Sequence, residues 1–296
     1  MTVGFMDTGE MSVSGELEAA ERAWRAQLPR LTQEFAARWS LTLGDPFTMG
    51  GSASWVAPAR TSTGKRVVLK LGWTHEEALH EADGLRLWRG DGTIKLLASH
   101  VAGPTTALLL ELCEPGIQLS QALPEPERDL VVAGLLRRLW IQPPSGHPFR
   151  PLALMCEQWA TRFELDNSEA VAQGKEQIDP GIARDGIELF RQLPLTADRS
   201  VLLLTDLHHD NVLAAHREPW LVIDPKPYVG DPAYDTLQHM LNFPGRLSSD
   251  PSGLAARMAA LLDLDPQRVR LWLFARCVQE SVDEPELREV AAKLAP

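Results

Sequence analysis

Val201-Leu-Leu-Leu-Thr-Asp206-Leu-His-His-Asp-Asn211 is an apolar run that leads to an aspartate and, five residues later, to an asparagine. Trp220-Leu-Val-Ile-Asp224 repeats the arrangement with a second apolar run and a second aspartate. A buried strand that ends in a carboxylate is costly unless the charge meets a metal ion, a cation or a set of hydrogen bonds. Taken singly, each aspartate is equally well explained as a turn residue after a strand. Taken together, two carboxylates and an amide oxygen are the hard ligands that Mg²⁺ with bound phosphates requires, so the stretch predicts such a site.

The spacing within this stretch narrows the chemistry. Asp206-x4-Asn211, followed by Asp224 thirteen residues on, reproduces the kinase catalytic loop and its metal-binding aspartate. His208 and His209 leave open a second interpretation, a hydrolytic metal centre in which the neighbouring aspartates are further ligands. Adjacent histidines on a turn point in different directions and lack the ligand intervals of zinc sites, so the kinase interpretation is favoured.

A second pair of residues points to nucleotide binding. Lys70 lies inside the apolar run 67–71, where a lysine is rarely buried without a partner. On a helix expected at 75–89, Glu81 lies on the apolar stripe, which also holds Ala78, Ala82, Leu85 and Trp88. We expect Lys70 and Glu81 to pair, as the pair that holds nucleotide phosphates in kinases does. Glu77 is the competing partner, and a solvated lysine at a strand end is the plain alternative.

A run of small residues, Gly50-Gly51-Ser52-Ala53-Ser54, precedes the strand of Lys70. Glycines let backbone N–H groups approach phosphate oxygens, and serine hydroxyls add donors. A Gly-Gly turn by itself is most often a hairpin, and this run is neither a Walker A motif nor a full GxGxxG motif. Its position makes Gly50, Gly51, Ser52 and Ser54 candidate nucleotide-binding residues.

The composition limits the possible partners. The sequence holds 29 Lys and Arg against 40 Asp and Glu, a net charge of −11. This excess of acid disfavours nucleic acid as a partner and favours a cationic small molecule. The N-terminus lacks the pattern of a signal peptide, and no uncharged apolar run reaches the ~18 residues that would span a membrane. The three cysteines lie at long spacings, as expected in a reducing compartment. We expect a cytoplasmic monomer or homodimer that does not bind membranes.

The order of the expected elements suggests two lobes. Residues 16–39 are expected to be helical, with Leu17, Ala20, Trp24 and Leu28 on one face and an interruption at Pro29. Strands separated by turns are expected within 47–72 and at 107–112, and helices dominate after a break near 113–116. The predicted fold is α+β, with a sheet-rich N-terminal lobe at 1–112 and a larger, mainly helical C-terminal lobe at 113–296. The second lobe would hold the catalytic loop, the metal site and the substrate pocket.

These motifs resemble those of a known family. Thr205-Asp-Leu-His-His-Asp-Asn211, together with Ile223-Asp-Pro-Lys-Pro-Tyr-Val-Gly-Asp-Pro-Ala-Tyr-Asp235, resembles the aminoglycoside phosphotransferases, and most closely the streptomycin 6-phosphotransferase and hydroxyurea phosphotransferase branch. Residues 108–116 resemble the segment that links the lobes and 278–281 the C-terminal helix, so the similarity spans roughly 45–290. It implies a protein-kinase-like fold and phosphorylation of an antibiotic hydroxyl by ATP and Mg²⁺.

The resemblance also assigns roles to individual residues. It implies that Asp206 orients and deprotonates the acceptor hydroxyl and that Asn211 and Asp224 hold Mg²⁺. It implies that Lys70, held by Glu81, positions the α- and β-phosphates of ATP. The backbone of 111–113, and hence Glu111 and Cys113, would meet the adenine, while Asp231 and Asp235 would brace the catalytic loop.

Two positions depart from the family pattern. The family usually has His-Gly-Asp where this chain has Leu204-Thr205-Asp206, so the loop is expected to be braced differently. Asp210 stands where relatives often have glycine and adds a carboxylate beside Asn211. It would bind a cation, raise the local acidity or disturb the metal site.

Three functions follow from these residues. The first is an antibiotic kinase for streptomycin or a related cationic aminocyclitol, with Glu280, Asp283, Glu284 and Glu286 as candidates to line the pocket. The alternative for these acidic residues is a solvated helix start, because acidic side chains favour helix N-termini. The second function is a kinase for hydroxyurea or another small hydroxyl compound. The third is a nucleotide-binding pseudokinase, which the changes at Leu204 and Asp210 would allow.

Overall fold

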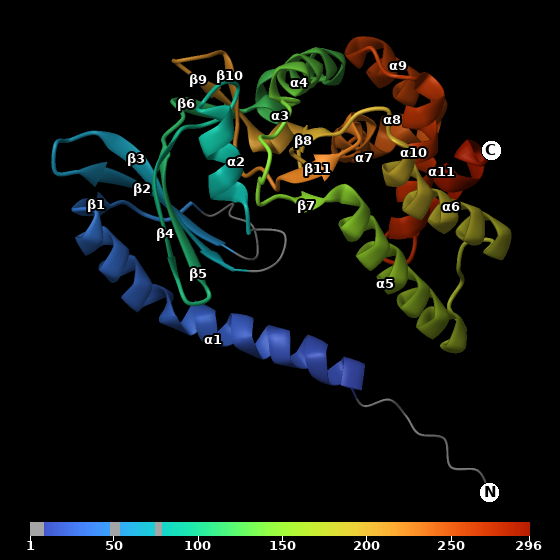
Figure 1. Ribbon diagram of the computed structural model, residues 1–296, viewed down its shortest axis with the longest axis horizontal. Helices are drawn as coiled ribbons and strands as arrows, with labels where there is room; N and C mark the ends of the chain where they lie inside the picture. Colours follow the sequence, from blue (N-terminus) through green and yellow to red (C-terminus); the bar gives the residue numbers. More distant parts are fainter. Residues whose placement is uncertain (1–8, 48–53, 75–78) are drawn as a thin grey trace, which may run out of the picture. The chain divides into compact units, whose positions relative to one another are not determined.

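The chain forms two compact units, which are seen in the computed structural model of residues 9–47, 54–74 and 79–296 (Figure 1). The first unit contains Met1–Ala82 and Lys95–Leu112, and the second contains Asp83–Ile94 and Cys113–Pro296. The chain thus passes from one unit to the other between Leu112 and Cys113, and a short segment before it belongs to the second unit. The division into a nucleotide-binding lobe and a substrate lobe stays a prediction.

The first unit is built on a five-stranded antiparallel sheet in the order β1-β2-β3-β5-β4. Its strands are β1 (Leu41–Leu43), β2 (Ser54–Thr61), β3 (Arg66–Trp73), β4 (Leu96–Ala102) and β5 (Thr105–Glu111). Strand β3 is central, and Lys70 lies opposite Val56 of β2 and Leu108 of β5. Strand β4 was not predicted, because it is a partly exposed edge strand whose sequence is interrupted by Ser99 and His100.

A long helix, α1 (Gly9–Arg38), covers one face of this sheet (Figure 1). Trp24, Leu31 and Phe35 are buried against Leu69 and Leu71 of β3. The indole Nε1 of Trp24 also donates a hydrogen bond of 3.0 Å to the Thr105 hydroxyl. Aromatic side chains that bury both their rings and their polar atoms contribute strongly to a core, so α1 is an integral part of this unit.

Helix α1 differs from the prediction in two ways. It continues through Pro29, although proline removes one helical hydrogen bond and usually kinks or ends a helix. Packing of Trp24 before the proline and of Leu31 and Phe35 after it holds both halves of the helix against the sheet. Ala20, placed on the apolar face by the sequence, is exposed.

Helix α2 (Glu81–Trp88) is shorter than the predicted helix at 75–89. Residues 79–80 form a turn, and 75–78, which include Glu77 and Ala78, lie outside the described residues. The predicted apolar face is confirmed at Glu81, Leu85 and Trp88, which are all buried.

The second unit is mainly helical. Its helices after α2 are α3 (Leu119–Ala122), α4 (Glu125–Leu139), α5 (Leu152–Ala172), α6 (Pro180–Gln192), α7 (Leu237–Leu241), α8 (Pro244–Ser249), α9 (Pro251–Leu262), α10 (Pro266–Glu280) and α11 (Leu287–Leu294). Short 3₁₀ helices occur at η2 (Leu193–Thr196), η3 (His209–Asn211) and η4 (Pro232–Thr236). Helix α10 is central, and α6 lies so close to it that a Cβ on Gly186 would be 2.5 Å from the Val278 side chain.

Two small sheets in this unit carry the motif residues. One has the order β10-β9-β6, with β6 (Pro115–Gln118), β9 (Val212–Ala215) and β10 (Trp220–Val222). The other has the order β7-β11-β8, with β7 (Arg150–Pro151), β8 (Val201–Leu203) and β11 (Tyr228–Gly230). The predicted α+β class, with a sheet-rich first part and a helical second part, is confirmed. No helix in the described part of the chain is long and apolar enough to cross a membrane.

Candidate active site

The segment between β8 and η3 forms a loop that a buried carboxylate holds in place. Asp235, only 2% exposed, accepts hydrogen bonds from the backbone N–H groups of Leu204 and Thr205 at 2.8–3.1 Å. The indole of Trp140 donates a further bond of 3.0 Å to it. Burial raises the pKa of Asp235 to about 6, against the lowering effect of these donors. The expected bracing role of Asp235 is therefore visible in its contacts.

Asp231 braces a different part of the unit. Its carboxylate accepts a hydrogen bond from the backbone of Ala233, and bonds of 2.6 Å from Arg268 and from the indole of Trp272. Arg268 and Trp272 both lie on α10. The expectation that Asp231 braces the catalytic loop is thus wrong in detail, since the residue ties η4 to α10.

Leu204 and Thr205 differ from the residues that the family usually has, and the structure explains each of them differently. Leu204 is 1% exposed and packs into the hydrophobic core of the second unit. Thr205 has φ +51°, in the left-handed region that favours glycine. Its hydroxyl donates a bond of 2.6 Å to the carbonyl of Lys226, and this bond helps hold the strained backbone.

Asn211 is placed beside Asp224 by a hairpin. Strands β9 and β10 pair with Val212 opposite Val222, and one step further the N–H of Ile223 donates to the carbonyl of Asn211 at 2.9 Å. Asp224 follows directly and has φ +51°, which turns the chain away from the strand. Two residues separated by thirteen positions therefore lie next to each other because of strand register.

The amide of Asn211 also reaches the catalytic loop. Its Nδ2 donates a hydrogen bond of 3.0 Å to the backbone carbonyl of Asp206. This bond uses the amide nitrogen and leaves the oxygen as the atom that can coordinate a cation. The loop and the hairpin thus connect the backbones of Asp206, Asn211 and Asp224, and the roles of these residues toward a metal ion stay predictions.

The donor set suits Mg²⁺ better than zinc. Among residues 9–47, 54–74 and 79–296, no group of three or more His, Cys, Asp or Glu side chains is arranged to hold a metal ion alone. Mg²⁺ is usually held by one or two protein oxygens together with waters and substrate phosphates. Asn211 and Asp224 fit that requirement, whereas the hydrolytic centre built on His208 and His209 finds no support.

The two histidines pack within the loop instead. His208 accepts a hydrogen bond from the Asp210 backbone through Nδ1 at 3.3 Å. His209 is buried, and its ring lies 5.1 Å from that of Phe243. Burial lowers the pKa of His209, with smaller opposing and reinforcing effects of nearby charges, so a neutral ring is favoured.

Asp210 has a side-chain partner on another helix. Its carboxylate accepts a hydrogen bond from the Ser120 hydroxyl, and its backbone carbonyl accepts one of 3.3 Å from Gln118. The added carboxylate therefore links η3 to α3 and β6. This contact gives the added carboxylate a structural role.

Lys226 is a residue whose place at this site the sequence analysis missed. Its Nζ lies 3.0 Å from Oδ2 of Asp206. The residue stands two positions after Asp224 and between two prolines, in Asp224-Pro225-Lys226-Pro227. The sequence feature that could have identified Lys226 is its position between two prolines, shortly after a candidate metal ligand.

The predicted Lys70–Glu81 pair forms in the first unit. Lys70 and Glu81 are 8% and 5% exposed, and Nζ of the lysine lies 2.7 Å from Oε2 of the glutamate. The pair joins the central strand β3 to the start of α2. A buried, charge-assisted contact of this length fixes the lysine side chain in one direction.

The other predicted nucleotide-binding residues are placed only in part. Gly50, Gly51 and Ser52 lie outside the described residues, and Ser54 begins β2 opposite Gly72. Glu111 ends β5, and its carboxylate accepts a hydrogen bond of 2.9 Å from the Lys95 backbone. Cys113 begins the longer segment of the second unit and is buried. Their roles toward a nucleotide stay predictions.

The acidic residues proposed for the substrate lie at and beyond the end of α10. Glu280 forms an ion pair with Arg276, a buried residue whose guanidinium lies 4.4 Å above the Trp159 ring. Asp283 and Glu284 are exposed. Partial burial and then repulsion from Glu280 and Glu286 raise the pKa of Glu284. Glu280 thus has an internal partner, whereas Asp283 and Glu284 face solvent.

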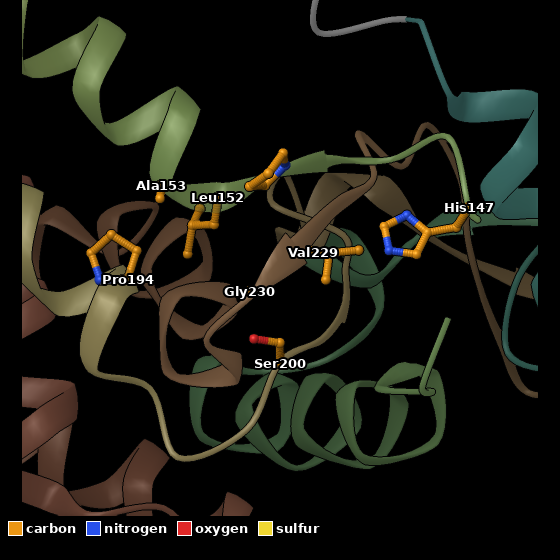
Figure 2. A pocket seen from close by; sticks show the side chains of 8 residues that line it. His147, Leu152, Ala153, Pro194, Ser200, Val229 and Gly230 are labelled. Carbon is orange, nitrogen blue, oxygen red and sulfur yellow. The ribbon is translucent and has the colours of Figure 1, made fainter. Parts of the chain in front are cut away.

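A small hollow in the second unit lies apart from these residues. It has a volume of about 240 Å³ and is lined by His147, Pro151, Leu152, Ala153, Pro194, Ser200, Val229 and Gly230. Figure 2 shows these side chains around the strand that carries Val229 and Gly230. None of the predicted site residues lines it. Gly230 is required there, because a Cβ on it would lie 2.4 Å from Leu152.

The chain is similar to characterised kinases over most of its length. Residues 38–286 match the family model described as aminoglycoside/hydroxyurea antibiotic resistance kinase. The hydroxyurea phosphotransferase of Kitasatospora aureofaciens is 35% identical over 92% of this chain and 78% of its own length. The streptomycin 6-kinase of Streptomyces glaucescens is 37% identical over 72% of this chain and 67% of its own length.

Solved structures give the same fold. The choline kinase LicA from Streptococcus pneumoniae is 14% identical, with a TM-score of 0.58 over 90% of this chain and 96% of that one. The predicted protein-kinase-like fold, the resemblance and the enzyme class are confirmed by these comparisons. This chain belongs to the family of aminoglycoside/hydroxyurea antibiotic resistance kinases and is a phosphotransferase that acts on a hydroxyl group of a small molecule.

Proposed function

We propose that the chain transfers the γ-phosphoryl group of ATP, with Mg²⁺, to a hydroxyl of a streptomycin-like cationic antibiotic. The observation that carries this proposal is the cluster of Asp206, Asn211 and Asp224, which the catalytic loop and the β9–β10 hairpin bring together. The reaction class follows from the family, and the residues of the cluster have the chemistry that the reaction requires.

Asp206 acts on the acceptor. The acceptor oxygen forms a bond to the γ-phosphorus, the bond from that phosphorus to the bridging oxygen breaks, and ADP departs with the electron pair. The proton of the hydroxyl passes to the carboxylate of Asp206. A positioned general base typically contributes ~10²–10⁴-fold to such a transfer. Bound Mg²⁺ would supply neutralisation of the phosphate charge, and Asn211 and Asp224 would hold it.

The binding of the nucleotide is assigned to residues between 50 and 113. Lys70, held by Glu81, is assigned to the α- and β-phosphates, and the backbone of 111–113 to the adenine. Gly50, Gly51, Ser52 and Ser54 are assigned to the phosphates through backbone N–H groups and hydroxyls. The buried Lys70–Glu81 contact supports the first assignment, because a fixed ammonium costs no reorganisation when phosphates bind.

The acceptor is assigned on charge and on similarity. The streptomycin 6-kinase relative and the net charge of −11 favour a cationic antibiotic, with Asp283 and Glu284 as the exposed carboxylates that would meet it. The hydroxyurea phosphotransferase relative aligns with more of the chain and supports hydroxyurea as the second candidate. The pseudokinase alternative loses its motivation, since Leu204 packs in the core and Asp210 is bound by Ser120.

The setting proposed for this activity is the cytoplasm, with the chain working as a monomer or homodimer and with neither nucleic acid nor membrane as partner. The excess of acidic residues supports the exclusion of nucleic acid, because binding to phosphate backbones needs basic side chains.

An acceptor panel tests the proposal. ADP release by the purified protein is measured with Mg²⁺ and ATP in the presence of streptomycin, several deoxystreptamine aminoglycosides, hydroxyurea or no acceptor. We expect release that depends on streptomycin and is several times the rate of the blank. Release with hydroxyurea alone would replace the first acceptor by the second, and rates equal to the blank throughout would contradict the proposal.

A further inference from the structure

Lys226 is anchored to the catalytic loop through its backbone. Its N–H donates a hydrogen bond of 2.9 Å to the carbonyl of Leu204, and its carbonyl accepts the bond of 2.6 Å from the hydroxyl of Thr205. Prolines on both sides fix the backbone torsions of the segment. The residue is therefore held at both ends against the loop that carries Asp206.

The side chain returns to the same loop. Nζ of Lys226 lies 3.0 Å from Oδ2 of Asp206, and the two side chains are 33% and 21% exposed. Ion pairs between exposed side chains are worth little, because two flexible chains must be ordered to form them. Here both side chains are mostly buried and the backbone of Lys226 is fixed to the loop of Asp206, so water screens the ion pair less and the fold sets the positions of both residues. Contact through Oδ2 leaves Oδ1 as the oxygen available to the acceptor hydroxyl.

In the proposed reaction, the contact between Lys226 and Asp206 would offset negative charge. The phosphoryl group carries negative charge and must approach the acceptor oxygen, whose proton passes to Asp206 as the bond to ADP breaks. The carboxylate and the phosphoryl oxygens repel each other over a few ångströms in a partly desolvated site. An ammonium bound to the carboxylate offsets that repulsion and needs no rearrangement during the reaction.

We infer that Lys226 is a positioning residue for phosphoryl transfer, which orients the Asp206 carboxylate and offsets its charge as the phosphoryl group arrives. The inference rests on the proposed function, because it requires Asp206 to be the base. It differs from the role of Lys70, which is to bind the nucleotide. Lys226 is expected to affect the rate of transfer and not the affinity for ATP.

The first test uses variants that separate charge from shape. Lys226→Met removes the charge at similar length, Lys226→Arg keeps it, and Lys175→Met is the control, since Lys175 is exposed in the connection after α5. The acceptor that the wild type phosphorylates is used, so that failure of the wild type bears on the proposed function alone. We expect Lys226→Met to lower kcat by about 10²-fold, the size found for loss of one electrostatic contact in other active sites.

The remaining parameters distinguish positioning from a loss of folding. The Kd for MgATP and the KM for the acceptor should change less than about threefold in Lys226→Met, and Lys226→Arg should regain most of the rate. A kcat within threefold of the wild type in Lys226→Met would overturn the inference. So would a large rise in the Kd for MgATP with unchanged kcat, which would make Lys226 a nucleotide-binding residue.

A second test combines two measurements, of which the first needs no substrate. Thermal unfolding midpoints of the nucleotide-free protein are measured for Lys226→Met, Asp206→Asn and the double variant. Residues that form a pair give non-additive shifts, so the double variant should lose less than the sum of the single variants. In the Asp206→Asn background, Lys226→Met should also change the residual rate less than threefold. Additive shifts, or a full further 10²-fold loss of rate, would show that Lys226 does not act through Asp206.

Discussion

Two residues of the candidate active site have left-handed backbone torsions. Thr205 and Asp224 both have φ +51°, a conformation that costs most non-glycine residues about 1–2 kcal/mol. Thr205 directly precedes Asp206, the proposed base, and Asp224 is itself a proposed metal ligand. Hydrogen bonds from Thr205 to Lys226 and to Asp235 offset the cost. Strain of this kind persists only where the surrounding contacts fix the backbone.

Substitutions of Thr205 separate the strain from the hydrogen bond. Thr205→Val keeps the branched shape and the strain but loses the bond to the Lys226 carbonyl, and should lower the free energy of unfolding by about 1–2 kcal/mol. Thr205→Gly loses the same bond but relieves the strain, so it should be the more stable of the two. Urea unfolding measures the difference. A glycine variant less stable than the valine variant would contradict the account of this position.

Asp224 is expected to bind Mg²⁺, and its torsion dictates the variant that tests this. Asp224→Asn removes the charge while keeping a residue that tolerates left-handed torsions. We expect the Kd for MgATP to rise at least about tenfold, which corresponds to about 1.4 kcal/mol. Asp198→Asn, at an exposed aspartate, serves as the control. A Kd and a Mg²⁺ dependence equal to those of the wild type would remove Asp224 from the metal site.

At the scale of elements, buried polar contacts join strands to helices. Lys70 and Glu81 connect β3 to α2 in the first unit. In the second unit, Asp235 of η4 holds the loop after β8, and Ser120 of α3 holds Asp210 of η3. Each contact fixes an irregular or terminal segment that carries a proposed functional residue.

The Lys70–Glu81 pair allows stability and nucleotide binding to be separated. Removing one partner of a buried pair leaves an uncompensated charge, so Glu81→Gln should lower the free energy of unfolding by about 3–5 kcal/mol and weaken ATP binding. Replacing both residues, in Lys70→Met/Glu81→Leu, should restore most of the stability and none of the ATP binding. Chemical denaturation and nucleotide titration measure the two effects. Normal ATP binding by the double variant would contradict the assignment of Lys70.

At the scale of the second unit, four helices meet at one buried carboxylate. Asp129 of α4 is fully buried and accepts hydrogen bonds from His239 of α7, Arg246 of α8 and Arg257 of α9 at 2.6–3.0 Å. Burial acts to raise the pKa of Asp129, but these donors together lower it well below its usual range. Burial lowers the pKa of His239, against the opposing effect of Asp129. A neutral His239 therefore donates through Nε2.

Acid should destabilise the protein through this network. His239 has a lower pKa in the folded state, so the unfolded chain binds the proton first, and stability falls as pH drops through about 6.5. Asp129 adds a further loss below about pH 4, where the unfolded chain protonates its carboxylates. One proton contributes at most about 1.4 kcal/mol per pH unit. Urea unfolding from pH 8 to pH 4 measures the slope.

His239→Gln keeps a donor toward Asp129 but removes the titrating group, so it should flatten the slope between pH 7 and pH 5 relative to the wild type. His216→Gln, at an exposed histidine, should keep the wild-type slope. Equal slopes in the wild type and in His239→Gln would show that His239 does not contribute to the acid sensitivity.

Several strands and one side-chain pair of this protein could be predicted from the sequence. The features that could not be predicted were missed for physical reasons. The apolar runs before Asp206 and Asp224 predicted two strands, which are β8 and β10. The pairing of Lys70 with Glu81 followed from helical periodicity. Register explains these successes, because hairpins and helices fix which neighbours meet.

Contacts between segments that are far apart in the sequence could not be predicted from such local patterns. No local signal links Ser120 to Asp210 or Asp129 to α9, since these pairs are about 90 and 128 positions apart. The edge strand β4 lacked an apolar run, and Pro29 suggested a helix end that packing overrides. Lys226 was visible in the sequence, but its partner was known only once the loop was folded.

The central claim is that Asp206 serves as the base for phosphoryl transfer to a small-molecule hydroxyl. Transfer of labelled γ-phosphate from ATP to streptomycin and to hydroxyurea is followed in a single turnover, for the wild type and for Asp206→Ala, with the Kd for MgATP measured in both. We predict labelled product with the wild type, a rate lower by at least ~10²–10⁴-fold in Asp206→Ala, and a Kd within about threefold. A near-normal rate in Asp206→Ala, or no product from the wild type with either acceptor, would contradict the account.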